Sequence, residues 1–356
     1  LLARWLGPKE FGLVGMISVF LAIGKSLVDS GLSSSIIRTK NADDEDFSTV
    51  FYMNFAMSIF TYLILFFVAP YIALFYDQEI LTNIIRVYCL SFIISAFSAI
   101  HLAILNKEMK FKRLMILNIP ATIMGVLVGL FLGYKGYGVW SIIYLFLTTQ
   151  IVLSALLWMT SKWTPSLRFS KTKLLYHYKF GYKLMLSGLL NQIFDNSYNI
   201  LIGKFFPLQI LGFYERAKRF NDFPAMTIAG IVGKVTYPML SNLQSDKVKL
   251  SIICKKTLKL TFFITAPLML GLAAIAYPLF KIILGENWLT AVPFFQILSL
   301  SSILYPIHSI NITILKVFGR SDLFLKLEII KKIIIVLSII IGFQFGVLGL
   351  VWSVVF

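Results

Sequence analysis

Charged side chains lie inside segments that are otherwise apolar. The stretch 21-LAIGKSLVDSGLSSSIIR-38 contains Lys25 and Asp29, which are four residues apart and therefore share one face of an α-helix. A charge at the centre of a membrane-spanning helix costs about 2.5–3.5 kcal/mol on insertion scales, so it is retained for a function or a partner. Opposite charges one helical turn apart also partly neutralise each other. We expect Lys25 and Asp29 to face an aqueous cavity, and mutual pairing for packing is the alternative.

A polar stripe follows in the second half of the chain. In 191-NQIFDNSYNILIGKF-205, Asn191, Asp195 and Asn199 are spaced four residues apart and lie on one helix face. Asparagine side chains also join membrane helices through hydrogen bonds, so packing is the alternative role for the two amides. For the carboxylate of Asp195 we expect a cavity or coupling role, because a charge inside the membrane is costly.

Basic residues follow this stripe. The segment 212-GFYERAKRF-220 places Arg216 and Arg219 on one helix face, and Lys234 lies deeper in the same apolar segment. The two arginines lie near the margin of that segment, where long basic side chains also extend to the membrane interface without any binding role. The residue types therefore indicate either a basic cavity or an interfacial position for Arg216 and Arg219.

Residues typical of catalysis or metal binding are scarce. The three histidines are dispersed, and no two of them have the spacing of metal ligands. Cys89 and Cys254 fall in or beside apolar segments, where we expect them to pack rather than form a disulfide. The acidic run 43-DDED-46 directly precedes an apolar segment, so we interpret it as a helix N-terminus rather than a metal-dependent glycosyltransferase site. We predict no catalytic residue, no metal and no cofactor.

The elements that position these residues are membrane-spanning helices. Apolar residues make up 58% of the chain, charged residues make up 14%, and the mean hydropathy is +0.83. A soluble domain has about 25% charged residues, because its surface must be wetted. Long runs such as 60-FTYLILFFVAPYIALF-75 lack the alternation of a membrane β-barrel. The predicted fold class is an all-α polytopic membrane helix bundle.

Apolar runs separated by short polar loops predict the individual spans, since about 20 apolar residues cross a bilayer as a helix. The predicted spans are 12–36, 48–76, 80–105, 114–134, 137–160, 180–206, 210–240, 257–284, 289–316 and 323–343. Two apolar stubs flank them, at 1–4 and from 346 onward. Because the first residue is not Met and the last residues are apolar, we expect the chain to be a fragment with both terminal helices truncated.

The basic residues orient the bundle. With the N-terminal stub counted as the first span, most of the 33 Lys and Arg residues fall in the loops after even-numbered spans. The positive-inside rule places those loops in the cytoplasm, and the segment 161–179 is the most basic of them. The net charge of +17 is then mostly a topology signal. No contiguous soluble basic domain exists, so we expect no nucleic-acid partner.

A weak internal repeat divides the chain. Leu81-Thr82 and Tyr137-Gly138-Val139 are echoed 208 residues later by Leu289-Thr290 and Phe345-Gly346-Val347. Six spans per repeat predict two six-helix lobes related by an axis along the membrane normal, with a central cavity between them. The predicted lobes are 1–160 and 180–356, joined by the cytoplasmic linker 161–179. That linker forms either an interfacial helix or a basic loop that only sets topology.

Several stretches carry a family resemblance along nearly the whole chain. They are "LARWLGPKEFGLV", "DSGLSSSIIRTKNADDEDFSTVFYMN", "FKRL", "GYGVWS", "KWTPSLRFS", "LLNQIFDNSYNILIGKFF", "LGFYERAKRF", "GENWLTAVPFFQIL" and "GRSDLFLKL". The chain resembles the polysaccharide flippases of the Wzx type, especially the WzxC-like branch of the multidrug/oligosaccharidyl-lipid/polysaccharide exporter superfamily. It departs from them at Tyr198, where such proteins often have Asp; Asp195 lies one turn earlier.

The resemblance implies a transporter of the bacterial or archaeal inner (plasma) membrane. Its expected substrate is a polyprenyl-diphosphate-linked oligosaccharide, moved to the outer leaflet by alternating access for surface polysaccharide biosynthesis. Cations in the cavity would meet the diphosphate. The expected substrate-binding residues are Lys25, Arg216, Arg219 and Lys234. Asp29 and Asp195 are expected to bind a coupling cation (H⁺ or Na⁺) or to pair with the bases, and Asn191 and Asn199 to form a polar cavity face.

Two other functions stay open at this point. A drug/cation antiporter of the same superfamily would favour an acidic cavity, whereas the intramembrane charges here are more basic. A membrane polymerase or glycosyltransferase would need a large outward loop with catalytic acids, and the predicted outward loops are short. The expected partners are the lipid-linked oligosaccharide and membrane lipids. We expect a monomer that works near glycosyltransferases or a polymerase.

Overall fold

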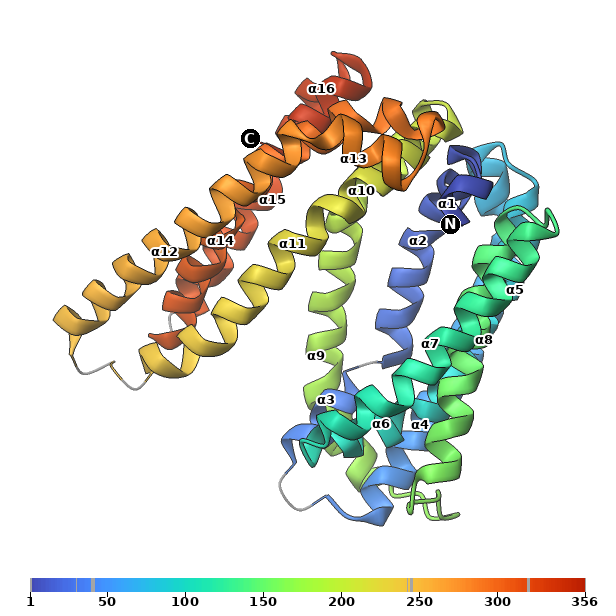
Figure 1. Ribbon diagram of the computed structural model, residues 1–356. Helices are drawn as coiled ribbons and strands as arrows, with labels where there is room; N and C mark the ends of the chain where they lie inside the picture. The colour runs from blue at the N-terminus through green and yellow to red at the C-terminus, as the bar shows by residue number, and fades with distance from the viewer. Residues whose placement is uncertain are drawn as a thin grey trace. The chain divides into compact units, whose positions relative to one another are not determined.

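The computed structural model describes residues 2–29, 31–39, 42–241, 243, 246–318 and 321–355, and this part of the chain contains helices and no strand (Figure 1). It divides into two compact units, Leu1–Phe205 and Phe206–Phe356. The all-α fold predicted from hydropathy is therefore confirmed.

The first unit contains ten α-helices within its described residues. They are α1 (Leu2–Trp5), α2 (Pro8–Asp29), α3 (Leu32–Arg38), α4 (Asp44–Tyr76), α5 (Ile80–Tyr88), α6 (Leu90–Lys107), α7 (Phe111–Tyr134), α8 (Val139–Thr160), α9 (Lys171–Asp195) and α10 (Ser197–Phe205). The most extensive helix pair is α7 with α8, and α4 packs against α2, α5 and α6. The linker 161–179 forms no helix of its own, because 161–170 is irregular and α9 begins at Lys171.

The second unit contains six α-helices and one 3₁₀-helix within its described residues. They are α11 (Leu208–Ser241), α12 (Lys247–Ala274), α13 (Ala276–Ile283), the 3₁₀-helix η1 (Glu286–Ala291), α14 (Val292–Val317), α15 (Ser321–Phe343) and α16 (Gly346–Trp352). Helix α14 packs against both α11 and α12, and these three run side by side in Figure 1. Both cysteines of the chain are buried free thiols, as their apolar surroundings predict.

Among the described residues, seven helical segments are long and apolar enough to cross a membrane. They are Pro8–Asp29, Asp44–Tyr76, Ile80–Lys107, Phe111–Tyr134, Val139–Thr160, Val248–Ala274 and Glu286–Leu315. The predicted spans 180–206, 210–240 and 323–343 also form helices, but their charged and polar residues keep them outside this set. The chain is thus a multi-pass membrane protein, and these three spans stay predictions.

The predicted span 12–36 exists as the apolar helix α2, Pro8–Asp29, but its predicted C-terminal end is wrong, because α2 ends at Asp29 and a separate helix, α3, begins at Leu32. Gly31 adopts φ +66°, in the left-handed region, and a Cβ on it would lie 2.5 Å from the carbonyl oxygen of Gly181. Only glycine allows this backbone turn together with this close approach of α9. Lys25 and Asp29 consequently lie at the C-terminal end of α2 rather than near the middle of a span.

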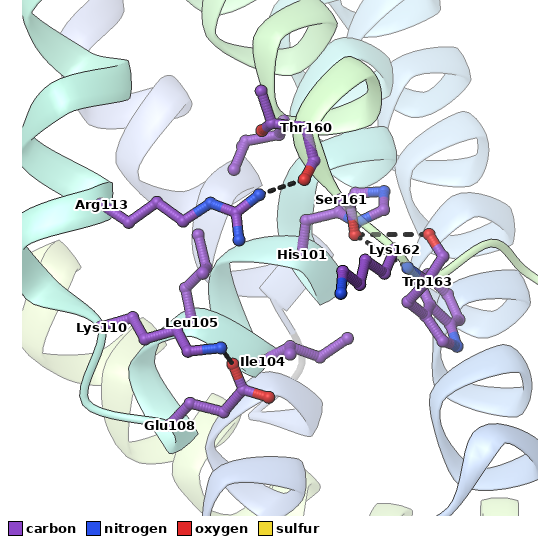
Figure 2. A pocket seen from close by; sticks show the side chains of 11 residues that line it. His101, Ile104, Leu105, Glu108, Lys110, Arg113, Thr160, Ser161, Lys162 and Trp163 are labelled. Carbon is purple, nitrogen blue, oxygen red and sulfur yellow. Dashed lines mark hydrogen bonds and ion pairs between the residues drawn. The ribbon is translucent and has the colours of Figure 1, made fainter.

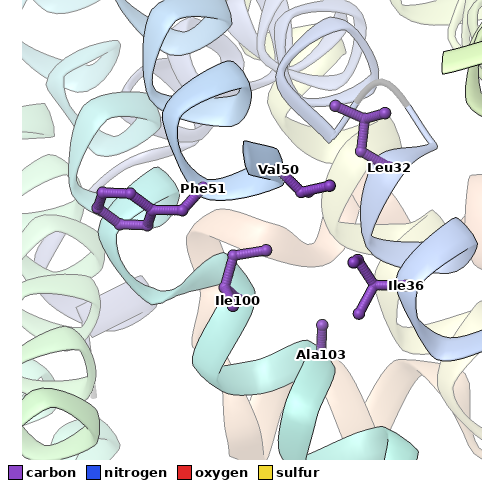
Figure 3. Packing of buried hydrophobic residues seen from close by; sticks show 6 residues of the cluster. All are labelled: Leu32, Ile36, Val50, Phe51, Ile100 and Ala103. Carbon is purple, nitrogen blue, oxygen red and sulfur yellow. The ribbon is translucent and has the colours of Figure 1, made fainter. Parts of the chain in front are cut away.

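Buried residues of three helices join the first unit near this break. Leu32 and Ile36 of α3 pack on Val50 and Phe51 of α4, and on Ile100 and Ala103 of α6 (Figure 3). Helix α4 begins beside this cluster with a capping box, in which Asp43 accepts from the backbone N–H of Asp46 and Asp46 accepts from that of Asp43. The capping role predicted for 43–46 is confirmed.

Candidate functional site

The charged pair at the end of α2 is exposed. Lys25 and Asp29 share a face of the helix, and no ion pair joins them within the described residues. Helix α9 passes close by, since a Cβ added to Gly188 would lie 2.9 Å from the hydroxyl oxygen of Ser26. The ion pair considered as the alternative is thus absent from the described residues, and both side chains are exposed at the end of α2.

The polar stripe at the end of α9 is divided between two environments. Asn191 and Asp195 are exposed, and α9 ends at Asp195. Asn199 belongs to α10, is 2% exposed, and donates from its Nδ2 to the hydroxyl of Ser18 in α2 at 3.3 Å. The Asn199 amide thus packs α10 against α2, the alternative considered for it, whereas Asn191 and Asp195 lie at the surface.

In the second unit, Arg216 and Arg219 lie on α11 and differ in their surroundings. Arg216 is half-buried, and its guanidinium carbon lies 5.6 Å from the ring centroid of the buried Trp288. Trp288 is itself held against Phe213, with ring centroids 6.0 Å apart. Arg219 is exposed. A cation over an aromatic face is attracted by the ring quadrupole, so Arg216 has a fixed position. The side chain of Lys234 lies outside the described residues.

An ionic network that the sequence analysis missed joins the N-terminal ends of α4 and α9. The amino group of Lys173 lies 2.5 Å from Oδ1 of Asp43, 3.1 Å from Oε2 of Glu45 and 3.4 Å from Oδ2 of Asp46. The hydrogen bond from Lys173, together with the N–H of Asp46, holds the pKa of Asp43 well below its usual range. Burial disfavours the charge on Lys173, but hydrogen bonds to Asp43 and Glu45 outweigh it and raise its pKa.

A buried hydrogen-bond chain continues from this network. His177 has no exposed surface, and its Nδ1 lies 2.8 Å from the hydroxyl of Ser35 while its Nε2 lies 3.1 Å from Oδ1 of Asp46. The order Ser, His, Asp is that of a nucleophilic triad. Ser35 is also fully buried, however, so a substrate has no path to its hydroxyl. The hydrogen bonds of Ser35, His177 and Asp46 instead connect α3, α4 and α9.

A second ion pair joins α10, the helix after α9, to the C-terminal end of α4. Lys204 of α10 lies 3.0 Å from Oδ2 of Asp77, which follows the last residue of α4. Lys204 also lies over the ring of Phe75, 5.3 Å from its centroid. The α9–α10 pair is thus attached to α4 at both ends by charged groups. Lys173 and His177 are four residues apart and share one helix face, which was a sequence signal for the attachment of α9 to α4. The spacing did not identify their partners, which are distant in sequence.

The helical architecture, with its long apolar helices, defines a multi-pass membrane protein. Residues 1–293 match the family model described as "Polysaccharide biosynthesis protein", and the chain belongs to this family. The resemblance to WzxC-type proteins seen in the sequence is thereby confirmed.

Two curated relatives illustrate the family. The chain is 27% identical over 308 residues to "Teichuronic acid biosynthesis protein TuaB" of Bacillus subtilis, covering 83% of this chain and 62% of TuaB. It is 23% identical over 351 residues to "Lipopolysaccharide biosynthesis protein WzxC" of Escherichia coli, covering 98% of this chain and 71% of WzxC. The chain therefore spans less than two thirds of the length of TuaB.

Solved structures share the fold. A structure titled "Lipid II flippase MurJ, inward closed conformation" matches with a TM-score of 0.80 and 19% identity, covering 99% of this chain and 80% of that one. An inward-facing "multidrug resistance MATE family transporter of the MOP superfamily" matches with a TM-score of 0.67 and 18% identity, covering 99% and 89%. At such identities the likeness concerns the fold alone.

Proposed function

We propose that the protein is a flippase that moves polyprenyl-diphosphate-linked oligosaccharide from the cytoplasmic to the outer leaflet of the plasma membrane. The observation that carries this proposal is the exposed Lys25 at the end of the apolar helix α2, which forms no ion pair with Asp29 within the described residues. A diphosphate cannot cross hydrocarbon without compensation of its charge. A cation on an otherwise apolar helix supplies that compensation through charge-assisted hydrogen bonds.

The printed descriptions of similar proteins support this chemistry. The name of TuaB refers to teichuronic acid biosynthesis and that of WzxC to lipopolysaccharide biosynthesis. MurJ is named as a lipid II flippase. The substrate proposed here has a polar part that must change leaflet, and the fold shared with a flippase suits that task. We accordingly place the protein in the synthesis of a surface polysaccharide, either lipopolysaccharide or exopolysaccharide.

The individual residues take the following roles in the proposal. Arg216, Arg219 and Lys234 join Lys25 as bases for the diphosphate. Asp29 and Asp195 bind a coupling cation, H⁺ or Na⁺, or position those bases, and Asn191 contributes polar surface. The lobes 1–160 and 180–356 alternate access around the linker 161–179. The protein acts as a monomer and as a transporter without a catalytic step, beside the glycosyltransferases or polymerase that make and consume its substrate.

A drug/cation antiporter is the second candidate, favoured by the likeness to the MATE transporter fold. A cationic drug would require exposed acids without competing bases. Here Lys25 accompanies Asp29, and Arg219 is also exposed. The charges therefore favour an anionic substrate over a cationic one.

Complementation of a flippase-deficient strain tests the proposal. The protein should restore surface polysaccharide, and Lys25→Ala should abolish this at normal membrane abundance. Lys9→Ala is the matched control, because Lys9 is an exposed base at the start of the same helix. Failure to complement together with gained resistance to cationic drugs would favour the antiporter. Loss of function in both variants alike would show that the position of Lys25 has no special role.

A further inference from the structure

A basic pocket lies in the first unit, between the end of α6, the start of α7 and the end of α8. These helix ends adjoin the basic loops. Its volume is about 210 Å³, which is ample for a ligand larger than a single water. The lining residues include His101, Glu108, Lys110, Arg113, Lys162 and Trp163, and Figure 2 shows them around one hollow. None of these residues belongs to the substrate-binding set proposed above.

The pocket carries an excess of positive charge. Lys110 lies 2.7 Å from Oε2 of Glu108, and this is the one carboxylate in the lining. Arg113 donates to the backbone carbonyl of Thr160, which fixes the guanidinium without neutralising it. Lys162 forms no ion pair within the described residues. Three cations facing one anion make the pocket a site for an anionic group.

Two nitrogen atoms in the lining are buried and have no hydrogen-bond partner within the described residues. One is Nε2 of His101, a residue that is 2% exposed, and the other is the indole Nε1 of Trp163. Nδ1 of His101 lies 3.0 Å from the hydroxyl of Ser161, and its ring centroid lies 5.3 Å from that of Trp163. The ring is thus held in place. The tautomer of His101 sets whether its Nε2 donates or accepts, whereas the indole N–H of Trp163 can only donate. A buried donor without a partner is uncommon, and an anionic oxygen is an acceptor of the kind it lacks.

The surface beside the pocket is apolar and exposed. Phe111 and Met115 in the first turns of α7 are 57% and 64% exposed, and Met159 near the end of α8 is 81% exposed. Helix α7 and helix α8 are both among the described segments apolar enough to span a membrane, so exposed apolar side chains at their ends suit contact with acyl chains. A ligand with a phosphate and an attached apolar tail therefore matches the pocket and its surroundings better than a free ion.

We propose that this pocket binds the phosphate of an anionic glycerophospholipid in the leaflet that contacts the basic loops. Lys110, Arg113 and Lys162 would hold the phosphate oxygens, and the acyl chains would lie along the exposed start of α7. Basic pockets between membrane helices on the cytoplasmic side are a known type of head-group site. The proposal requires only that the chain is a membrane protein, so it stands independently of the flippase function.

Lipid binding by the purified protein in a zwitterionic detergent tests this proposal. Native mass spectrometry would count bound phosphatidylglycerol against phosphatidylcholine in wild type and in an Arg113→Gln, Lys162→Gln double variant. At about fivefold per cation near a membrane surface, the double variant should lose about twenty-fivefold in preference for phosphatidylglycerol. Lys112→Gln is the matched control, because Lys112 is an exposed base next to Arg113 and does not line the pocket.

A variant with the opposite expected effect distinguishes loss of the site from misfolding of the double variant. Glu108→Gln removes the single carboxylate and should increase the preference for phosphatidylglycerol. An equal loss in Lys112→Gln and the double variant would overturn the site in favour of general surface attraction. Displacement of the lipid by inorganic phosphate as effectively as by phosphatidylglycerol would overturn the lipid assignment in favour of a free-anion site. An unchanged preference in Glu108→Gln would also contradict it.

Discussion

Removal of the Asp46 carboxylate should destabilise the first unit strongly. Asp46 is 7% exposed, and its oxygens accept from His177 at 3.1 Å, from the backbone N–H of Asp43 at 3.0 Å, and from Lys173 at 3.4 Å. Asp46→Ala therefore breaks three interactions and leaves the fully buried ring of His177 without its Nε2 partner.

The magnitude follows from the kind of each interaction. A hydrogen bond to a charged group contributes about 1.5–3 kcal/mol, and half of a capping box contributes about 1 kcal/mol. The pair with Lys173, which is partly exposed, adds about 0–1 kcal/mol. The free energy of unfolding should fall by about 3–5 kcal/mol, since removing one partner of a buried polar pair lies in this range. For a unit of this size the midpoint of thermal unfolding should fall by about 10 °C.

Thermal unfolding of the detergent-solubilised protein measures this effect. Asp44→Ala is the matched control, since Asp44 is exposed in the same first turn of α4 and its carboxylate forms no ion pair within the described residues. That control should lose only the interaction with the helix dipole, about 0.3–1 kcal/mol. If both variants unfold at the same temperature, the network does not hold α4 to α9 in the way its geometry indicates.

Three further predictions follow from other contacts. Because the pKa of Asp43 is lowered in the folded state, its ion pair stabilises the fold above the unfolded carboxyl pKa of about 3.9. The midpoint of thermal unfolding should therefore drop as the pH falls below about 4, and a midpoint that does not change with pH in that range would contradict the role of this pair. Gly129→Ala should lower the free energy of unfolding by about 1–3 kcal/mol, because its Cβ would lie 2.9 Å from Cβ of Leu145. Gly230→Ala, whose Cβ would lie in open space, should raise it slightly, and equal effects of the two substitutions in an unfolding assay would contradict this packing. A cysteine at Thr172 should resist an impermeant maleimide added to intact cells, because the linker is predicted to be cytoplasmic; rapid labelling would reverse the orientation.

Local patterns in the sequence predicted the helices and one cap. The apolar runs are long enough to identify the spans, and the acids 43–46 stand next to the helix that they cap, so both signals are contained in short stretches. The break after Asp29 was missed because the apolar pattern continues across it, and the backbone that packs closely on Gly31 is that of Gly181, 150 residues away in sequence. Hydropathy carries no information about such a contact.

The charged clusters were harder to predict for the same reason. His177 contacts Ser35 and Asp46, which are 142 and 131 residues away in sequence. From the sequence alone it was therefore interpreted as an isolated histidine. Lys110, Arg113 and Lys162 were interpreted only as topology signals, although the fold brings them to one pocket. Lys25 and Asp29 were singled out on the expectation of a mid-span position, whereas they lie exposed at the end of α2, and their role stays a prediction.

Transport by a charge-deleted variant tests the central proposal most directly. The measurement is the appearance of a polyprenyl-diphosphate-linked oligosaccharide in the outer leaflet of proteoliposomes, followed by lectin binding, with folded protein in the membrane quantified in parallel. If Lys25 contacts the diphosphate, Lys25→Ala and the Lys25→Ala, Asp29→Ala double variant should both lose transport, while Lys25→Arg keeps part of it because a cavity base need not be bidentate. Full transport by the double variant at normal abundance would contradict the proposal.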